Sequence, residues 1–172
     1  MAIQIATAQD VPALVRLLDR AYRGEPSKKG WTTEANLLQG DRRTDEPTLL
    51  QLMQSLGSIF LKYTNDQGIL TGCVFLQPND TKLYLGMLSV DPDGQAGGIG
   101  KQLMTAATAY AREKNLEAIF MRVISVRHEL VNWYNKLGYV DTGIREPFKV
   151  DERFGVPTQP LEFIILEKQL NS

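Results

Sequence analysis

The spacing of apolar residues predicts a chain that alternates between strands and helices. Short apolar runs typical of strands occupy 3–6, 58–63, 69–77, 82–90, 118–124, 139–142 and 161–167. Helices are predicted where apolar residues recur every three or four positions, or where cap and stop residues frame a segment. These segments are 11–22, 31–40, 44–57, 99–114 and 127–137. Such a mixture indicates an α/β protein in which a mixed sheet carries helices on its faces.

Three of the predicted strands follow one another directly in the segment 58–90. The turns between them are short, so we expect these strands to be antiparallel neighbours. The segment 143–160 is expected to form a long irregular loop, a kind of segment that often carries function. Because no repeat or linker divides the chain, we expect residues 1–172 to form a single domain.

A glycine-rich turn joins the strand at 82–90 to the helix that follows it. Between Val90 and Leu103 the sequence reads DPDGQAGGIGKQ. Backbone N–H groups at the start of a helix, together with the positive end of the helix dipole, favour an anion such as phosphate. The turn therefore predicts a site for a cofactor that carries phosphate groups.

Residue spacing separates the possible kinds of phosphate loop. A P-loop requires Gly-x₄-Gly-Lys-Ser/Thr, but Gln95 stands at its first glycine and Gln102 at its hydroxyl position. The dinucleotide fingerprint Gly-x-Gly-x-x-Gly fails because Leu103 takes the place of its third glycine. A tight turn without a ligand is a further alternative, although three glycines within 94–98 exceed what such a turn requires.

The remaining spacing, Gln-x-x-Gly-x-Gly, is formed by Gln95, Gly98 and Gly100. Together with the preceding strand it resembles the acyl-CoA-binding motif of the GNAT family of N-acetyltransferases. The segment 132–139, NWYNKLGY, resembles the second signature of that family, an aromatic pair on a helix that leads to a glycine and an aromatic residue. The order of predicted elements also matches. The resemblance implies the GNAT fold: a mixed, mostly antiparallel central sheet, splayed at the cofactor strand, with helices on both faces.

The same resemblance implies acetyl-CoA as acyl donor and a primary amine, on a small molecule or a peptide, as acceptor, with direct attack in a ternary complex. The pyrophosphate of coenzyme A suits the amides of the glycine-rich turn, where glycines let the backbone approach closely. The pantetheine arm can pair with a strand edge. The residues implied for coenzyme A are Leu88, Ser89, Val90, Gln95, Ala96, Gly97, Gly98, Ile99, Gly100 and Lys101.

Two groups are implied for the chemistry. The backbone N–H of Leu88 stands where relatives stabilise the oxyanion, and Tyr134 matches the tyrosine that faces the coenzyme A sulfur. A phenol with a pKa of about 10 can protonate a departing thiolate. Packing beside Leu130 and Leu137 is the alternative for Tyr134, since the three residues share a helix face. Arg127 stands where many relatives have asparagine. Its side chain is expected either to contact a phosphate of the cofactor or to lie in solvent.

No motif specifies the general base. Glu34, Tyr84 and Ser89 are candidates, and an ordered water is a further alternative. His128, the only histidine, is predicted to lie away from the thioester, and no metal site is expected. Lys101 and Arg112 are placed either near the 3′-phosphate of coenzyme A or in solvent.

The acceptor site is expected in the segments 23–39 and 143–160. An apolar wall is predicted from Trp31, Phe148 and Phe154, and Tyr84 is predicted as a further residue that binds the acceptor. The acidic residues of this region either hold a cationic amine or only keep a loop solvated; they are Glu34, Glu146, Asp151 and Glu152.

Composition narrows the remaining function classes. The chain is 43% hydrophobic and 23% charged with a net charge of −1, so there is no bulk attraction to nucleic acid or to an anionic membrane. No apolar run reaches the roughly 18 residues of a membrane span, and the single cysteine, Cys73, is expected as a buried thiol in a cytoplasmic protein. A homodimer is an open expectation. The alternative to an enzyme is a module of the same fold that binds or senses acyl-CoA without turnover.

Overall fold

The computed structural model describes residues 2–23, 27–28, 33–40, 42–149 and 152–170. Within these residues a seven-stranded sheet has the order β1-β3-β4-β5-β6-β9-β7, and β2 pairs with β8 in a separate ribbon. The strands are β1 (Ala2–Ile5), β2 (Leu38–Gln39), β3 (Ile59–Thr64), β4 (Leu70–Asn79), β5 (Lys82–Val90), β6 (Ala118–Ile124), β7 (Val140–Pro147), β8 (Val156–Pro157) and β9 (Glu162–Gln169). The α-helices are α1 (Val11–Tyr22), α3 (Glu46–Met53), α4 (Ile99–Glu113) and α5 (His128–Lys136). Short 3₁₀ helices are η1 (Ala8–Asp10), η2 (Pro92–Gly97) and η3 (Glu152–Phe154).

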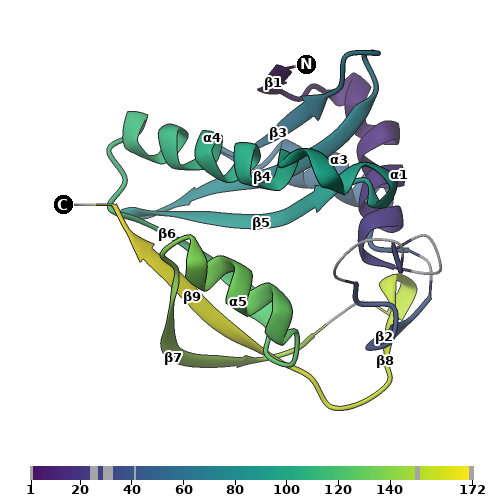
Figure 1. Cartoon of the computed structure of the whole chain (residues 1–172), viewed down its shortest axis with the longest axis vertical. Helices are drawn as coiled ribbons and strands as arrows, with labels where there is room; N and C mark the ends of the chain where they lie inside the picture. The colour runs from purple at the N-terminus through teal and green to yellow at the C-terminus, as the bar shows by residue number, and fades with distance from the viewer. Residues whose placement is uncertain (1, 24–26, 29–32, 41, 150–151, 171–172) are drawn as a thin grey trace.

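The sheet opens between β5 and β6, the one parallel pair among the described strands. These two strands pair only over three residues, Lys82–Tyr84 with Ala118–Phe120. Beyond Tyr84 they separate, and Figure 1 shows the gap widening toward α1 and the β2–β8 ribbon. The mixed, mostly antiparallel sheet, splayed at β5 and covered by helices, confirms the predicted fold class.

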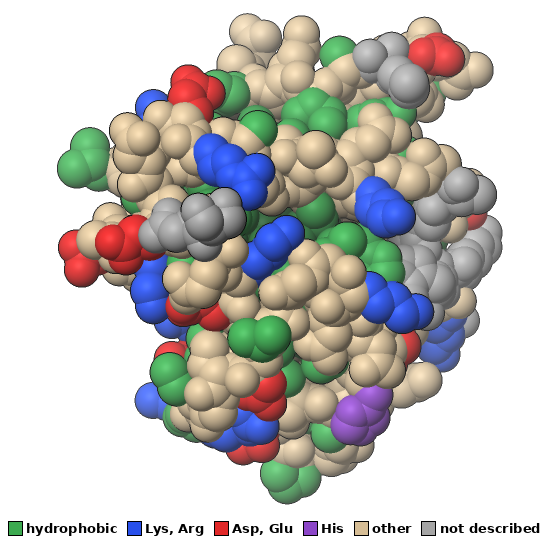
Figure 2. All heavy atoms as spheres, turned by 60° about the vertical axis from the view of Figure 1, so that its left-hand side comes forward, with side chains coloured by type: hydrophobic (Ala, Val, Ile, Leu, Met, Phe, Trp, Pro, Cys, Tyr) green, Lys and Arg blue, Asp and Glu red, His purple; other side chains and the backbone are tan. Residues whose placement is uncertain are grey.

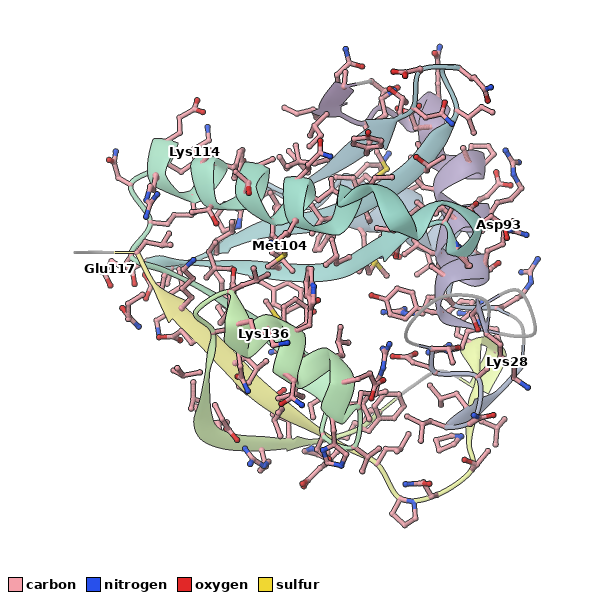
Figure 3. All side chains as sticks on the ribbon, in the orientation of Figure 1. Lys28, Asp93, Met104, Lys114, Glu117 and Lys136 are labelled. Carbon is pink, nitrogen blue, oxygen red and sulfur yellow. The ribbon has the colours of Figure 1, made fainter. Side chains whose placement is uncertain are left out.

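Helices cover both faces of the sheet because successive strand residues point to opposite sides. In β4, Cys73 and Phe75 pack with α1 and Leu49 of α3, whereas Val74 and Leu76 pack in the cluster that holds α4 and α5. Figure 3 shows Met104 on the side of α4 that faces the sheet, in agreement with its burial. The two packed faces hold β4 and β5 rigidly on one side of the opening.

A β-bulge interrupts β5 near its carboxyl end. Phe75 pairs with Gly86 and Cys73 with Ser89, so the single residue Val74 faces two residues of β5. One of these two, Met87, has a φ of 54°, which is uncommon for a residue with a side chain. A bulge bends and twists the strand, and here it lies where β5 leaves β6.

Three predictions about elements are wrong. Within the described part of 31–40 the chain forms a turn followed by β2 instead of a helix. The helix predicted over 44–57 was expected to be capped by its first residue, Thr44, but its cap is Asp45, whose side chain accepts a hydrogen bond from the Thr48 amide at 2.9 Å. The segment 143–160 is only partly irregular, since β7 extends to Pro147 against β9 and Val156–Pro157 pairs with β2. The other predicted strands and helices are confirmed with small shifts at their ends. No described helix has the length and hydropathy needed to cross a bilayer.

Candidate active site

Two cavities meet in the opening of the sheet. The first cavity lies between the end of β5, the start of α4 and the half-buried side of α5, and its lining includes Leu88, Ser89, Val90, Gly98, Gly100, Lys101 and Trp133. The second cavity lies between β5 and β6, and its lining includes Glu34, Arg43, Tyr84, Arg122, Phe148, Lys149 and Phe163. Residues shared by both are Tyr22, Leu88, Arg127, Leu130 and Tyr134.

The start of α4 forms one end of the first cavity. Gly98 is the cap residue with a φ of 70°, and no side chain caps the helix there. The first amides of α4 therefore have no side-chain acceptor at this cap, which leaves a helix terminus suited to an anion. A Cβ added at Gly100 would lie 3.6 Å from the Trp133 ring, which is an ordinary contact distance, so the start of α4 lies directly beside the Trp133 side chain of α5.

An ion-pair cluster fixes the turn that precedes α4. Arg20 of α1 contacts Asp91 at 3.4 Å and Asp93 at 3.0 Å. The Asp91 carboxylate also accepts from the Asp93 amide at 3.0 Å and caps η2. Of the residues predicted for coenzyme A, Gln95, Ala96 and Gly97 lie in η2, and the side chains of the first two lie outside the described part. Ile99 points away from the cavity into the core.

Hydrogen bonds hold the bulge of β5 in place. The Tyr22 hydroxyl donates to the carbonyl oxygen of Leu88 at 2.7 Å. The Ser89 hydroxyl and the Cys73 thiol donate to the carbonyl of Met87 at 3.1 Å and 3.6 Å. Burial raises the pKa of the Tyr22 phenol to about 12 and that of the Cys73 thiol to about 12, so both groups are protonated donors near neutral pH. The peptide between Met87 and Leu88 is therefore fixed at the meeting point of the cavities.

Tyr134 lies at that meeting point. Its side chain is buried, and its ring packs edge-on against Trp133 and Tyr139 with centroids 5.2 Å and 6.0 Å away. Burial raises the pKa of its phenol above the ordinary value, because an apolar environment disfavours the phenolate. Tyr134 is thus a neutral proton donor in reach of both cavities. The alternative predicted from its helical spacing, packing in the core, also holds for its ring.

Glu34 joins two buried arginines. One carboxylate oxygen accepts from Arg23 at 2.9 Å, and the other accepts from Arg127 at 2.9 Å. All three side chains are at most 8% exposed, and burial lowers the pKa of the Arg23 guanidinium. Because both oxygens are engaged by guanidinium groups, this arrangement disfavours Glu34 as a proton acceptor. The prediction of a solvated Arg127 is wrong: it is buried and lines both cavities.

The other predicted acceptor residues are dispersed. Tyr84 and Phe148 line the second cavity, where the Phe148 ring packs at a tilt against that of Phe163 with centroids 5.0 Å apart. Phe154 is buried elsewhere, and its carbonyl accepts from Arg23. Trp31 and Asp151 lie outside the described residues, as does the side chain of Glu152. Glu146 pairs with Arg122 at 2.6 Å.

Sequence reasoning missed Tyr22, Arg43 and Phe163. Only its hydrogen bond to Leu88, 66 residues away, gives Tyr22 a role at the bulge. Arg43 lies over the Tyr22 ring at 5.3 Å. No spacing rule connects such distant segments, so the sequence carried no signal for them.

The remaining charged candidates differ in their distance from the cavities. Lys101 lines the first cavity. Arg112 is near the far end of α4, about 16 Å along the helix from Lys101 at 1.5 Å per residue. Figure 2 shows the only histidine, His128, at the surface, where the start of α5 leaves it exposed.

Comparison with solved structures finds the same fold over nearly the whole chain. The ribosomal-protein-S18-alanine N-acetyltransferase of Escherichia coli has a TM-score of 0.74 and 16% identity, with 99% of this chain and 94% of that chain covered. A Salmonella typhimurium protein, thought to be an acetyltransferase and solved with its cofactor acetyl-CoA, has a TM-score of 0.70 and 20% identity, with 100% and 95% covered.

Sequence comparison gives a more local match. Mycothiol acetyltransferase of Saccharomonospora viridis is 34% identical over 61 residues, which are 34% of this chain and 20% of that protein. The chain therefore matches about a fifth of the length of that relative. The family described as "Acetyltransferase (GNAT) family" matches residues 12–139, which hold the bulge, the glycine-rich turn and Tyr134. The chain belongs to the GNAT family of acetyltransferases.

Proposed function

We propose that this protein transfers an acetyl group from acetyl-CoA to a primary amine by direct attack in a ternary complex. The observation that carries the proposal is the meeting of two cavities at Tyr134 and the bulge of β5. Two substrates bound from opposite sides would place their reacting atoms at that point. Family membership and the acetyl-CoA of the Salmonella relative support the choice of donor.

The first cavity fits coenzyme A. Its pyrophosphate would accept hydrogen bonds from the amides at the start of α4, with the Lys101 ammonium alongside. Leu88, Ser89 and Val90 offer a strand edge that diverges from β6 and can pair with the amides of pantetheine. Bound there, acetyl-CoA supplies an acyl group activated by a thiol leaving group.

The residues of the opening would act on this acyl group in two ways. The Leu88 amide would donate to the carbonyl oxygen as negative charge develops on it, and the bond from Tyr22 to the Leu88 carbonyl fixes the strand at this point. Tyr134 would protonate the sulfur as it leaves. Burial keeps the phenol protonated before the transfer, because an apolar environment disfavours the phenolate.

The attacking amine must lose its proton on the side of the second cavity. Glu34 is a poor acceptor, because two guanidinium groups already engage its carboxylate. The Ser89 hydroxyl is buried and donates to the Met87 carbonyl. We therefore assign proton removal to water in the second cavity, beside Tyr84, and assign to Glu34 the role of holding Arg127.

The full-length chain with acetyl-CoA and a panel of primary amines provides the test. We expect thiol release that depends on the amine and saturates with it. Saturable binding of acetyl-CoA without thiol release on any amine would favour the alternative, a module that binds acyl-CoA without turnover. Absence of acetyl-CoA binding would contradict both.

A further inference from the structure

The second cavity is rich in positive charge. Among the described residues that line it, the charged ones are Arg23, Arg43, Arg122, Arg127, Lys149 and the single carboxylate Glu34. A cavity lined by one sign of charge attracts ligands of the opposite sign and repels those of the same sign. The prediction that acidic side chains line the acceptor site therefore fits this cavity poorly.

Internal ion pairs neutralise only part of this charge. Arg122 pairs with Glu146 at 2.6 Å. Glu34 lies between Arg23 and Arg127 and offers one negative charge to two guanidinium groups. These three buried side chains together keep one positive charge.

Arg43 is the cation best placed to meet a ligand. Its guanidinium lies 5.3 Å from the centroid of the Tyr22 ring, whose hydroxyl holds the Leu88 carbonyl at the bulge. The amide of the next residue, Thr44, donates to Asp19 of α1 at 3.2 Å, which ties this segment to the helix. No described carboxylate forms an ion pair with Arg43. A guanidinium fixed in this way matches a carboxylate with two parallel hydrogen bonds.

Apolar side chains also contribute to the lining of the second cavity. Phe148 and Phe163 pack with their rings tilted against each other, and Tyr84 of β5 and Met121 of β6 also contribute. Lys149 is exposed and adds charge next to this aromatic wall. The cavity thus offers a cation near the reaction point and an apolar surface beside it.

We infer that the acceptor is a small primary amine that also carries a carboxylate and an aromatic or other apolar group, with Arg43 as the residue that binds the carboxylate. This inference rests on the proposed acetyl transfer and names its substrate class. It excludes polyamines and other purely cationic amines as good acceptors, since they would bring further positive charge into the cavity.

Matched amines test the carboxylate directly. Acetyl transfer from acetyl-CoA would be measured for phenylalanine, phenylalanine amide, phenethylamine and a diamine with the full-length chain. We expect kcat/KM for phenylalanine to exceed that for each of the others by at least about tenfold. Phenylalanine amide is a demanding comparison. Its amine is less basic than that of phenylalanine, so a larger fraction of its molecules carries the neutral, nucleophilic amine, which by itself would favour the amide. An amide or a diamine that reacts as well as phenylalanine would overturn the inference while leaving the acetyl transfer intact.

Removing the charge of Arg43 tests whether this residue binds the carboxylate of the acceptor. Arg43→Met keeps a long side chain and is expected to raise KM for phenylalanine about tenfold or more, with kcat/KM for the amide within about twofold of the wild type. Arg16→Met is the matched control, because Arg16 is exposed on α1 and does not line the cavity. An Arg43→Met variant that loses both substrates equally, or neither, would contradict the assignment.

Equilibrium binding separates the two proposals. N-acetylphenylalanine and its amide would be titrated into the chain saturated with coenzyme A. Binding that requires the carboxylate and weakens in Arg43→Met, in a protein without turnover on any amine, would support the inference and contradict the enzyme. Turnover on amines, in a protein whose binding of the acetylated product does not depend on the carboxylate, would support the enzyme and contradict the inference about the carboxylate.

Discussion

Tyr134 is the residue at which the two cavities meet, and it has a close structural counterpart in Tyr139. Both phenols are buried in the same aromatic cluster, and their ring centroids lie 6.0 Å apart. Only Tyr134 lines the two cavities, whereas the Tyr139 hydroxyl is buried with no hydrogen-bond partner in the described structure. Substitutions at the two residues can therefore distinguish a chemical role of the Tyr134 hydroxyl from the packing role that both rings share.

Tyr134→Phe is expected to lower kcat about 100-fold and leave the affinity for acetyl-CoA nearly unchanged, because a general acid acts on the leaving thiolate and not on the bound donor. Steady-state kinetics with binding titrations would measure both quantities. Tyr139→Phe, the control, should keep the wild-type kcat. Equal activity in Tyr134→Phe and the wild type would remove the acid role.

The pH profile of kcat follows from the direction of the pKa shift. A general acid must be protonated, and burial raises the pKa of Tyr134 above the ordinary value of about 10. We therefore expect no alkaline fall in kcat from this group between pH 7 and about pH 10. An alkaline fall centred below about pH 9 that disappears in Tyr134→Phe would show a phenol with a lowered pKa, contrary to the structure.

Among the elements, α4 depends on a glycine in the strand beneath it. A Cβ at Gly72 of β4 would lie 2.8 Å from Cγ2 of Ile99, the first residue of α4. The glycine thus lets the start of the helix pack against the sheet, and that start forms the end of the first cavity.

Gly72→Ala is expected to cost about 1–3 kcal/mol of unfolding free energy through overpacking and to weaken acetyl-CoA binding, since Ile99 must move. Chemical denaturation and ligand titration would measure these effects. In an Ile99→Ala background Gly72→Ala should lower the unfolding free energy clearly less, because the side chain that meets the new Cβ has been removed and the two substitutions are therefore not additive. Equal costs in both backgrounds would show that Ile99 is not the obstacle.

Elements with a clear apolar period were predictable, and elements held by distant partners were not. The strand 118–124 coincides with β6, where buried residues alternate with more exposed ones around Arg122. In contrast, β7 is exposed along most of its length, so its apolar pattern gives no sign of its pairing with β9. The turn before β2 was predicted as a helix because nothing local shows that Glu34 is drawn into a buried ion pair.

At the scale of the whole molecule, the buried triad of Arg23, Glu34 and Arg127 joins the end of α1, the turn before β2 and the start of α5. The partners Glu34 and Arg127 are 93 residues apart in the chain. Arg23 also donates to the carbonyl of Phe154 and to that of Arg42 at 3.2 Å. The glycine-rich motif in the sequence indicates the side proposed for coenzyme A, whereas this triad and the charge of the second cavity arise only when these segments meet.

Glu34→Gln is expected to cost about 3–5 kcal/mol of unfolding free energy, because it leaves two buried guanidinium groups without their shared anion. Glu146→Gln, which breaks the partly exposed pair with Arg122, should cost less than about 1 kcal/mol. Urea denaturation would compare the two variants. Loss of activity in Glu34→Gln with an unchanged free energy of unfolding would indicate a catalytic base instead.

The central claim is that the opening between β5 and β6 binds the acyl donor. Amide hydrogen exchange of the full-length chain, with and without saturating acetyl-CoA, tests it without knowledge of the acceptor. We expect slower exchange in residues 88–101, from the bulge of β5 to the start of α4, and in the first turns of α5. Slower exchange confined to other segments, or no change at saturation, would contradict the claim.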